Sequence, residues 1–341
     1  MNIIITNNLI IGPKKRTLII AEVSANHCGS KKKFLKHILL AKKSGADLVK
    51  IQSYEAEDMV VDKNFKIKKG LWKNNNLWDL YKKAQTPLRW HEEAFNLAKK
   101  NNIELFSTPF SLRSLEYLKK FNPKIYKISS FEISDLNLIT EIAKLKKLII
   151  ISTGLSSLSE IKRAVDIIKK FHNKIIILYC VSSYPTKLEE FNFDKIKDIK
   201  RVTKINNVGF SDHSLGIEAS VAAMSKGVSV IEKHFKLNNN IKSPDSIFSI
   251  NPSQLKDLRN FSFSFNKIFN TFVESEKKNS LFFRRSIYAI KKIKKGEKLT
   301  KENIACFRPF AGICASKYFK LLGRKSKKMI NKNSVLKESY F

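Results

Sequence analysis

Residues able to do chemistry stand at the end of one short apolar run after another across residues 17–235. TLIIAEVS carries Glu22, DLVKIQS carries Lys50, LIIISTG carries Ser152 and VSVIEKHF carries His234. Continuous apolar runs bounded by turn residues predict buried parallel strands. Acidic, basic and imidazole groups at the C-terminal ends of such strands are typical of the catalytic mouth of a (β/α)₈ barrel. The repeated pattern therefore predicts an enzyme.

Two lysines and four hydroxyl side chains fall at these strand ends, where they can face one mouth. Cations and hydroxyl donors that converge in this way make an anion site, which suits a phosphate group best. The alternative for each lysine is a side chain that extends past the strand end to reach water. Because two lysines fall in register with the hydroxyls, we favour a phosphate site. Its predicted residues are Lys50, Thr108, Lys127, Ser130, Ser152 and Ser211.

His213 and His234 close two consecutive predicted strands, so their imidazoles can converge on one point. Two nitrogen ligands with open positions beside them describe a catalytic divalent metal site rather than a sealed structural one. The alternative is a pair of hydrogen-bonded interior histidines. Asp245 follows in the loop SPDSIFS, where it would hold a metal-bound water or a sugar hydroxyl, or simply form a turn.

Glu22 ends the first predicted barrel strand. Inside a cup shielded from water its pKa would be tuned for proton transfer. His27, in the turn NHCG that follows, has two open roles: contact with substrate or support of the loop.

Amphipathic segments with apolar residues at i, i+3 and i+4 separate the strands and predict helices. The alternation predicts an α/β chain with a TIM barrel, followed by a small β-rich domain. We assign residues 1–265 to the barrel, 266–280 to a linker and 281–341 to the small domain. Between Asp58 and His91 the strand-to-helix connection is unusually long, which predicts a substrate lid or pocket wall.

Composition and charge indicate which classes of protein the chain can belong to. The chain has 341 residues, 43% of them hydrophobic, and no stretch approaches the roughly 20 apolar residues of a membrane span. The opening MNIIITNNLIIGPKK reads as a β-hairpin rather than a signal peptide, which predicts a cytoplasmic protein. Its four cysteines show no CxxC spacing and are expected to be free thiols. The net charge of +35 would suit a polyanion-binding protein, but lysines spread over every helical segment favour solvated helix faces and no nucleic-acid partner.

The motifs AEVSANHCG, KIQSY, FSTPF, KISSFE, STG, YCVSSYPT, GFSDHSLG and IEKHF, in this order, resemble those of the sialic acid synthase family. The tail RRSIYAIKKIKKGEKLTKENI with FRPFAGI resembles the C-terminal antifreeze-like (SAF) domain of that family. The match covers essentially the whole chain. Within the family, the SANH turn, the GLW insert and DSIFS after Pro244 are most similar to pseudaminic acid synthases.

The resemblance implies a metal-dependent condensation of phosphoenolpyruvate with 2,4-diacetamido-2,4,6-trideoxyaltrose (6-deoxy-AltdiNAc), giving pseudaminic acid and phosphate. His213 and His234 would hold the metal, Mn²⁺ or else Mg²⁺ or Co²⁺, while Glu22 would transfer protons. The resemblance implies that further residues contact the sugar or a metal-bound water: Gln52, Glu132, Tyr184 and Asp245. Arg308 would reach from the SAF domain of one subunit into the barrel of the other, in a domain-swapped homodimer.

Two other functions remain open. An N-acetylneuraminate or legionaminate synthase would use the same phosphoenolpyruvate chemistry and all the catalytic residues above, because only the turn, the insert and the DSIFS loop separate the three. The remote alternative is a basic polyanion-binding protein, which predicts lysine and arginine gathered on one face.

Overall fold

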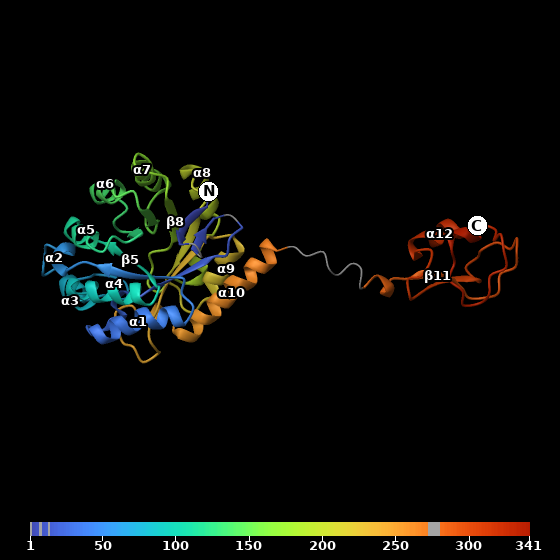
Figure 1. Cartoon of the computed structure of the whole chain (residues 1–341), viewed down its shortest axis with the longest axis horizontal. Coiled ribbons are helices and arrows are strands. Elements are labelled where there is room, and N and C mark those ends of the chain that lie inside the picture. The colour runs from blue at the N-terminus through green and yellow to red at the C-terminus, as the bar shows by residue number, and fades with distance from the viewer. Residues whose placement is uncertain (1, 7–8, 13, 272–279) are drawn as a thin grey trace. The chain divides into compact units, whose positions relative to one another are not determined.

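The computed structural model describes residues 2–6, 9–12, 14–271 and 280–341. It divides into two compact units, Met1–Thr271 and Phe272–Phe341 (Figure 1). The first unit is a closed barrel of parallel strands surrounded by helices, and the second is a small β-rich module. This architecture confirms the predicted TIM barrel followed by a small domain.

Eight strands form the barrel in sequence order, and the last pairs with the first: Val230 lies opposite Leu18, and His234 lies opposite Glu22. All the barrel pairs are parallel, so the C-terminal ends of the strands meet at one mouth. The strands are β3 (Leu18–Glu22), β4 (Leu48–Ser53), β5 (Glu104–Pro109), β6 (Ile125–Ile128), β7 (Leu148–Ser152), β8 (Ile175–Cys180), β9 (Val208–Asp212) and β10 (Val230–His234).

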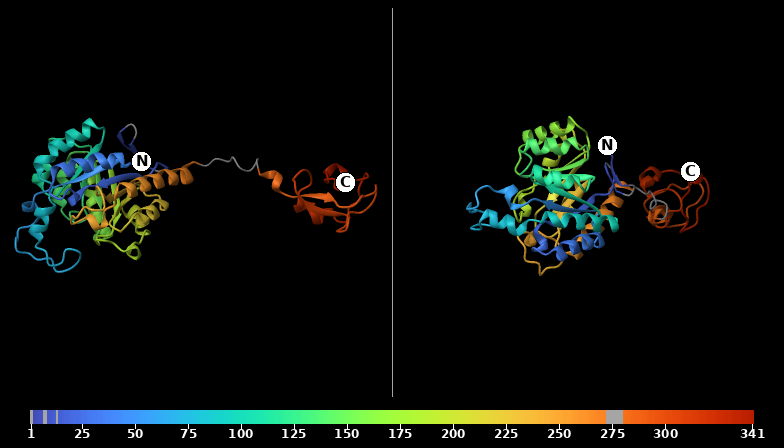
Figure 2. Two further views of the ribbon diagram at one scale, coloured as in Figure 1. Left: turned by 90° about the horizontal axis from the view of Figure 1, so that it is seen from below. Right: turned by 60° about the vertical axis from the view of Figure 1, so that its left-hand side comes forward.

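Helices ring the barrel, as both views of Figure 2 show. Several begin where the sequence offers a capping side chain: Ser30, Ser157 and Asn251 each accept a hydrogen bond from a backbone N–H of the first turn. Among the described helices, none is both long enough and apolar enough to cross a membrane. The helices are α1 (Lys31–Lys43), α2 (Ala56–Met59), α3 (Leu77–Ala84), α4 (His91–Lys100), α5 (Leu112–Lys119), α6 (Leu136–Lys144), α7 (Leu158–Lys169), α8 (Lys195–Thr203), α9 (Glu218–Ser225) and α10 (Pro252–Asn270).

Helix α10 corrects one detail of the predicted boundaries. The sequence analysis began the linker at residue 266, but residues 266–270 are the last turn of α10. Apolar side chains such as Phe265 pack against the barrel core and carry the helix through this region. Most of the predicted linker, residues 272–279, lies outside the described residues.

Alternation along each strand sorts its side chains between two cores. Outward residues such as Ile149, Ile151 and Ile177 pack under the helices. Inward residues such as Ile150 and Leu178 form a second cluster inside the barrel. Successive side chains of a strand point to opposite faces, so a continuous apolar run fills both cores at once.

A β-hairpin fills the barrel at the end opposite the mouth. Strands β1 (Ile3–Thr6) and β2 (Leu9–Ile11) pair antiparallel, as the sequence predicted. Ile3, Ile5 and Ile11 belong to the same apolar cluster as the inward residues of the barrel strands. We call this the closed end of the barrel.

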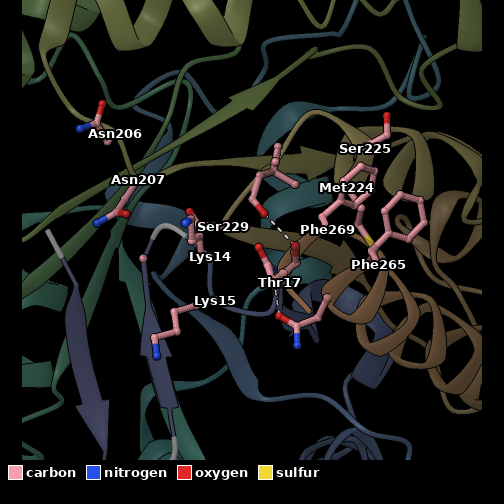
Figure 3. Close-up of a pocket in the computed structure, with 15 residues that line it drawn as sticks. Lys14, Lys15, Thr17, Asn206, Asn207, Met224, Ser225, Ser229, Phe265 and Phe269 are labelled. Atoms are coloured by element: carbon pink, nitrogen blue, oxygen red, sulfur yellow. Dashed lines mark hydrogen bonds between the residues drawn. The ribbon is translucent and has the colours of Figure 1, made fainter. Parts of the chain in front are cut away.

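A cavity of about 250 Å³ lies at the closed end (Figure 3). Thr17 and Ser229, just before β3 and β10, line it together with Lys14, Asn206 and Phe265. The Thr17 hydroxyl donates to the carbonyl of Val228 at 2.7 Å. None of the residues lining this cavity is acidic or a histidine, so it lacks the groups that the predicted chemistry requires.

The second unit folds around its own small apolar core. Strands β11 (Ser286–Ala289) and β12 (Ile304–Phe307) pair antiparallel, and the short helix α12 (Tyr318–Leu321) follows. Ile287, Ile304 and Leu336 are fully buried within it. The module therefore has the separate hydrophobic core expected of a domain.

Candidate active site

The inward positions change character at the mouth of the barrel. Glu22, Lys50, Lys127 and Glu232 stand two residues beyond the apolar inward residues of their strands, so they point into the same interior. The Lys50 Nζ lies 2.6 Å from Glu22 Oε2 and 3.6 Å from Glu232 Oε2. The Lys127 Nζ lies 3.7 Å from Glu232 Oε1. These four residues form an ion-pair cluster at the floor of the mouth.

Burial and mutual attraction set the protonation of this cluster. Burial raises the pKa of Glu22 to about 7, although the Lys50 ammonium opposes the shift. Burial also lowers the pKa of Lys127, an effect that Glu232 partly offsets. For Lys50 burial acts in the same direction, but Glu22 and Glu232 outweigh it and raise the pKa. Glu22 can therefore gain or lose a proton near neutral pH.

Hydroxyl groups surround the two lysines. The Lys50 ammonium donates to the Thr108 hydroxyl at 3.4 Å, and the Ser211 hydroxyl donates to Glu232 at 3.1 Å. The Ser152 hydroxyl is buried without a hydrogen-bond partner in the described structure. A buried polar group of this kind is expected to have a ligand or a water as its partner. Ser130, Ser152 and Ser211 line the same cavity as the lysines, whereas Thr108 lies behind Lys50 and contacts it.

His213 and His234 do converge, with ring centroids 5.5 Å apart. The Nδ1 of His213 lies 3.1 Å from the carbonyl of Val181, and the buried Nδ1 of His234 has no hydrogen-bond partner in the described structure. Burial lowers the pKa of His234 well below its usual range, which keeps its nitrogens free of an extra proton. Neutral, unpartnered imidazole nitrogen suits a divalent cation.

The imidazole pair is not a closed metal site. Among the described residues, no cluster of three or more His, Cys, Asp or Glu side chains could hold a metal ion. Asp245 Oδ2 is 3.8 Å from His234 Nδ1, but that carboxylate accepts hydrogen bonds from the Ser24 hydroxyl and the Ala25 N–H. A cation held by His213 and His234 would keep open positions for substrate or water.

One cavity of about 400 Å³ joins these groups. Three members of the ion-pair cluster, Lys50, Lys127 and Glu232, line it with both imidazoles and the other predicted sugar contacts. Glu22 is fully buried behind Lys50 and does not line the cavity. Tyr184 packs over His213, with ring centroids 4.5 Å apart, and the Glu132 carboxylate accepts from the Ser129 hydroxyl. The predicted site residues of the barrel that line this cavity are Lys50, Gln52, Lys127, Ser130, Glu132, Ser152, Tyr184, Ser211, His213, His234 and Asp245.

Two protein-family models match the chain. The model of the NeuB family matches residues 37–272, and that of the SAF domain matches residues 284–340. The chain belongs to the NeuB family. The resemblance to the sialic acid synthase family, drawn from the sequence motifs, is thereby confirmed.

Members of the NeuB family with known names resemble this chain over nearly its full length. It is 42% identical to a pseudaminic acid synthase of Campylobacter jejuni, over 96% of this chain and 97% of the relative. It is 37% identical to an N,N'-diacetyllegionaminic acid synthase of the same species, over 95% of this chain and 100% of the relative. The crystal structure of an N-acetylneuraminic acid synthetase from Leptospira borgpetersenii matches with a TM-score of 0.73 at 29% identity, covering 83% of this chain and 96% of the other.

The structure favours the supporting role for His27. The Gly29 N–H donates to His27 Nδ1 at 3.0 Å, and the Thr86 hydroxyl lies 3.3 Å from Nε2. The ring meets Phe34 and Trp90 edge to face and is fully buried. With both nitrogens engaged in this way, His27 braces the loop after β3 rather than facing the cavity.

Two groups of this NeuB-family site were not among the predicted site residues, although Glu232 was noted from the sequence at a strand end beside His234. Glu232 is the partner of both lysines, and the Cys180 thiol lies 3.2 Å from the Ser130 hydroxyl. Strand alternation could have found them, because Glu232 precedes His234 by two residues and Cys180 follows the inward-facing Leu178 by two.

Arg308 belongs to the second unit of the chain, not to the barrel. It follows β12 in the SAF-domain unit, where its side chain is exposed. Its role at the mouth of a partner subunit stays a prediction.

Proposed function

We propose that this protein condenses phosphoenolpyruvate with 2,4-diacetamido-2,4,6-trideoxyaltrose to form pseudaminic acid and inorganic phosphate. The observation that carries the proposal is the meeting of two buried lysines and two imidazoles in one cavity of a NeuB-family barrel. Identity of 42% to a pseudaminic acid synthase, against 37% to a legionaminic acid synthase, supports the choice of sugar.

Lys50 and Lys127 are the groups that would hold the phosphate and carboxylate of phosphoenolpyruvate. Their ammonium groups are nearly inaccessible, so their attraction to an anion is weakly screened by water. The unpartnered Ser152 hydroxyl would donate to the same anion. As C3 of the enolpyruvate attacks the aldehyde carbon and the phosphate later leaves, both lysines remain to balance the negative charge.

His213 and His234 are the residues that would hold a divalent cation, for which we propose Mn²⁺. When bound, such a cation supplies Lewis acidity to the aldehyde oxygen of the open-chain sugar. Tyr184 and Phe248 pack against the imidazoles and limit the directions from which a ligand can approach.

Glu22 is the group that we assign to proton transfer. Formation of the new C–C bond leaves positive charge at C2 of the former enolpyruvate, and water adds at that carbon. The ionised Glu22 accepts one proton from this water, and the former aldehyde oxygen, now an alkoxide, takes that proton up. The C–O bond then breaks, the remaining proton of the added oxygen leaves with the phosphate, and C2 becomes the ketone. The Ser24 N–H, which donates to Glu22 Oε1 at 2.8 Å, fixes the direction of the carboxylate.

The decisive assay measures phosphate release from phosphoenolpyruvate with Mn²⁺ and one sugar at a time. We expect release with 6-deoxy-AltdiNAc and little with N-acetylmannosamine or the legionaminate precursor. Release with N-acetylmannosamine alone would overturn the choice of sugar. Chelation with EDTA should abolish release, and restoring single metals would identify the cation.

Arg308 leads to a separate proposal, a swapped homodimer in which each SAF domain completes the partner's site. Arg308→Ala and His213→Ala chains, inactive alone, would be mixed and refolded together or co-expressed. Half of the dimers would be mixed and would hold one intact site, so about a quarter of wild-type activity should return. If the arginine instead served its own barrel, the mixture would stay inactive.

A further inference from the structure

The long connection after β4 forms a structured wall of the catalytic cavity, which we call the rim segment (residues 59–84). Its two arms are tied to each other: the Leu77 N–H donates to the Phe65 carbonyl at 2.9 Å, and the Ile67 N–H donates to the Asn75 carbonyl at 3.0 Å. In Figure 2 the light-blue loop between α2 and α3 extends from the body of the barrel. The segment therefore has a defined, hydrogen-bonded structure of its own.

A tryptophan fastens the rim segment across the mouth. The Trp72 Nε1 donates to the carbonyl of Pro244 at 3.3 Å, and its ring lies 5.6 Å from that of Tyr184. Pro244 stands next to Asp245 in the loop after β10. Two distant parts of the chain thus fix the rim segment above the imidazoles, and the cavity has a preformed outer wall.

The two faces of helix α3 differ in chemistry. Leu77, Leu80, Tyr81 and Ala84 recur at helical spacing and line the catalytic cavity. Asp79 and Lys83 line a separate hollow on the outer side, and Leu80 reaches both. None of the helix residues is fully buried, so this apolar stripe is only partly covered by the protein, where Tyr81 meets the buried Tyr54 edge to face.

The cavity is consequently polar at its floor and apolar at its rim. Side chains of the ion-pair cluster are at most 5% exposed, whereas Phe65 at the rim is 47% exposed. Phosphoenolpyruvate is a small anion and gains nothing from an apolar wall. The second substrate must present its aldehyde to the imidazoles, so the remainder of that molecule extends towards the rim segment.

We propose that Ile67 and the apolar stripe of α3 select a sugar whose far end is a methyl group rather than a hydroxymethyl group. This inference rests on the proposed function and assigns its substrate preference to particular side chains. A methyl group loses contact with water when it packs on Ile67 and Leu77, which is favourable. A hydroxyl packed on Ile67 and Leu77 would lose its hydrogen bonds to water and find no donor or acceptor on those two side chains.

The test compares kcat/KM for 6-deoxy-AltdiNAc with that for the same sugar bearing a hydroxyl at C6. We expect the wild-type protein to prefer the deoxy sugar by about 10²-fold, the range for a hydrophobic pocket that meets an added hydroxyl. Leu77→Gln and Ile67→Thr should each reduce this preference several-fold and leave the KM for phosphoenolpyruvate unchanged. Lys83→Gln, on the outer face of α3, is the matched control and should keep the full preference.

The outcomes separate this inference from the function on which it rests. A wild-type preference near unity, or a preference that survives both inner-face substitutions, would overturn the inference while the synthase activity stands. Failure to release phosphate with any of the sugars would overturn the proposed function itself. Thermal unfolding of each variant checks that the inner-face proteins are folded.

Discussion

The closed end and the mouth of the barrel interior are built from the same strands and contain opposite chemistry. Ile20 precedes Glu22, Ile125 precedes Lys127 and Ile150 precedes Ser152, each by two residues along one inward-facing row. The first of each pair lies in the apolar layer over the hairpin, and the second lies in the catalytic cavity or at its floor. One step along a strand thus divides residues that hold the barrel together from residues that act on substrate.

The largest effect is expected at the mouth. Lys127→Met keeps the side-chain length but removes a charge that would face the phosphate, so kcat/KM should fall by about 10³-fold, or about 4 kcal/mol. Glu232 retains Lys50 at 3.6 Å, so the structure keeps a partner for that carboxylate. Phosphate release and thermal unfolding would be measured side by side. Activity close to wild type would exclude Lys127 from anion binding.

At the closed end we expect the opposite result, a loss of stability with little loss of activity. Leu178→Ala removes a fully buried side chain from the apolar layer and should cost about 3 kcal/mol of unfolding free energy, or roughly 5 °C in Tm. Activity per folded molecule should stay near wild type. Leu178→Met, which conserves volume, is the control and should cost less than about 1.5 kcal/mol. A large loss of kcat without loss of stability would contradict the division into layers.

Gly209 holds the inward position two residues before Ser211, level with Leu178 of the apolar layer. A Cβ built there would stand 2.5 Å from the carbonyl oxygen of Val230 and 2.6 Å from Leu178, and the carbonyl belongs to rigid strand backbone. Gly209→Ala should therefore lower stability by about 2 kcal/mol and reduce activity as well, because Ser211 must move. Gly227→Ala is the contrasting case: its φ of +71° adds strain but nothing lies within 4 Å. If both variants behaved alike, crowding would not be the cause.

The smallest effect is a pH dependence set by Glu22. Because burial raises its pKa to about 7, the fraction of ionised carboxylate increases as pH rises through neutrality. The ionised form accepts the proton in our proposal, so at pH 6 kcat/KM should lie about tenfold below its plateau. The residual activity of Glu22→Gln should show no such limb. A wild-type profile that is flat from pH 6 to 8 would argue against Glu22 as the base.

Much of this division could be predicted from the sequence because each buried parallel strand is a continuous apolar run that ends in polar residues. The runs that contain Ile150 and Leu178 identified strands without any knowledge of their neighbours. Lys50, Lys127 and the two histidines followed from the rule that parallel strand ends share one mouth. Which inward residues interact with one another did not follow from that rule.

The remaining contacts depend on segments far apart in the chain. The Ser24 hydroxyl meets Asp245, and the Trp72 indole meets Pro244, across loops whose shapes no local pattern specifies. Glu232 was visible in the motif IEKHF, but its attraction to Lys50 and Lys127 depends on distances across the barrel. The opposite faces of α3 could be read from spacing, whereas the cavity that its apolar face lines could not.

The hairpin beneath the barrel has a consequence for how the protein assembles. The barrel is complete only when its last strand, β10, pairs with its first strand, β3, as Val230 does with Leu18. Until β10 has been synthesised, the isoleucines of β1 and β2 lack a closed ring of strands around them. Closure of such a distant pair is slow because the intervening chain must first lose its freedom. Partly made chains would therefore present an apolar surface that chaperones recognise, and the hairpin would become protected from hydrogen exchange only when the last strand docks.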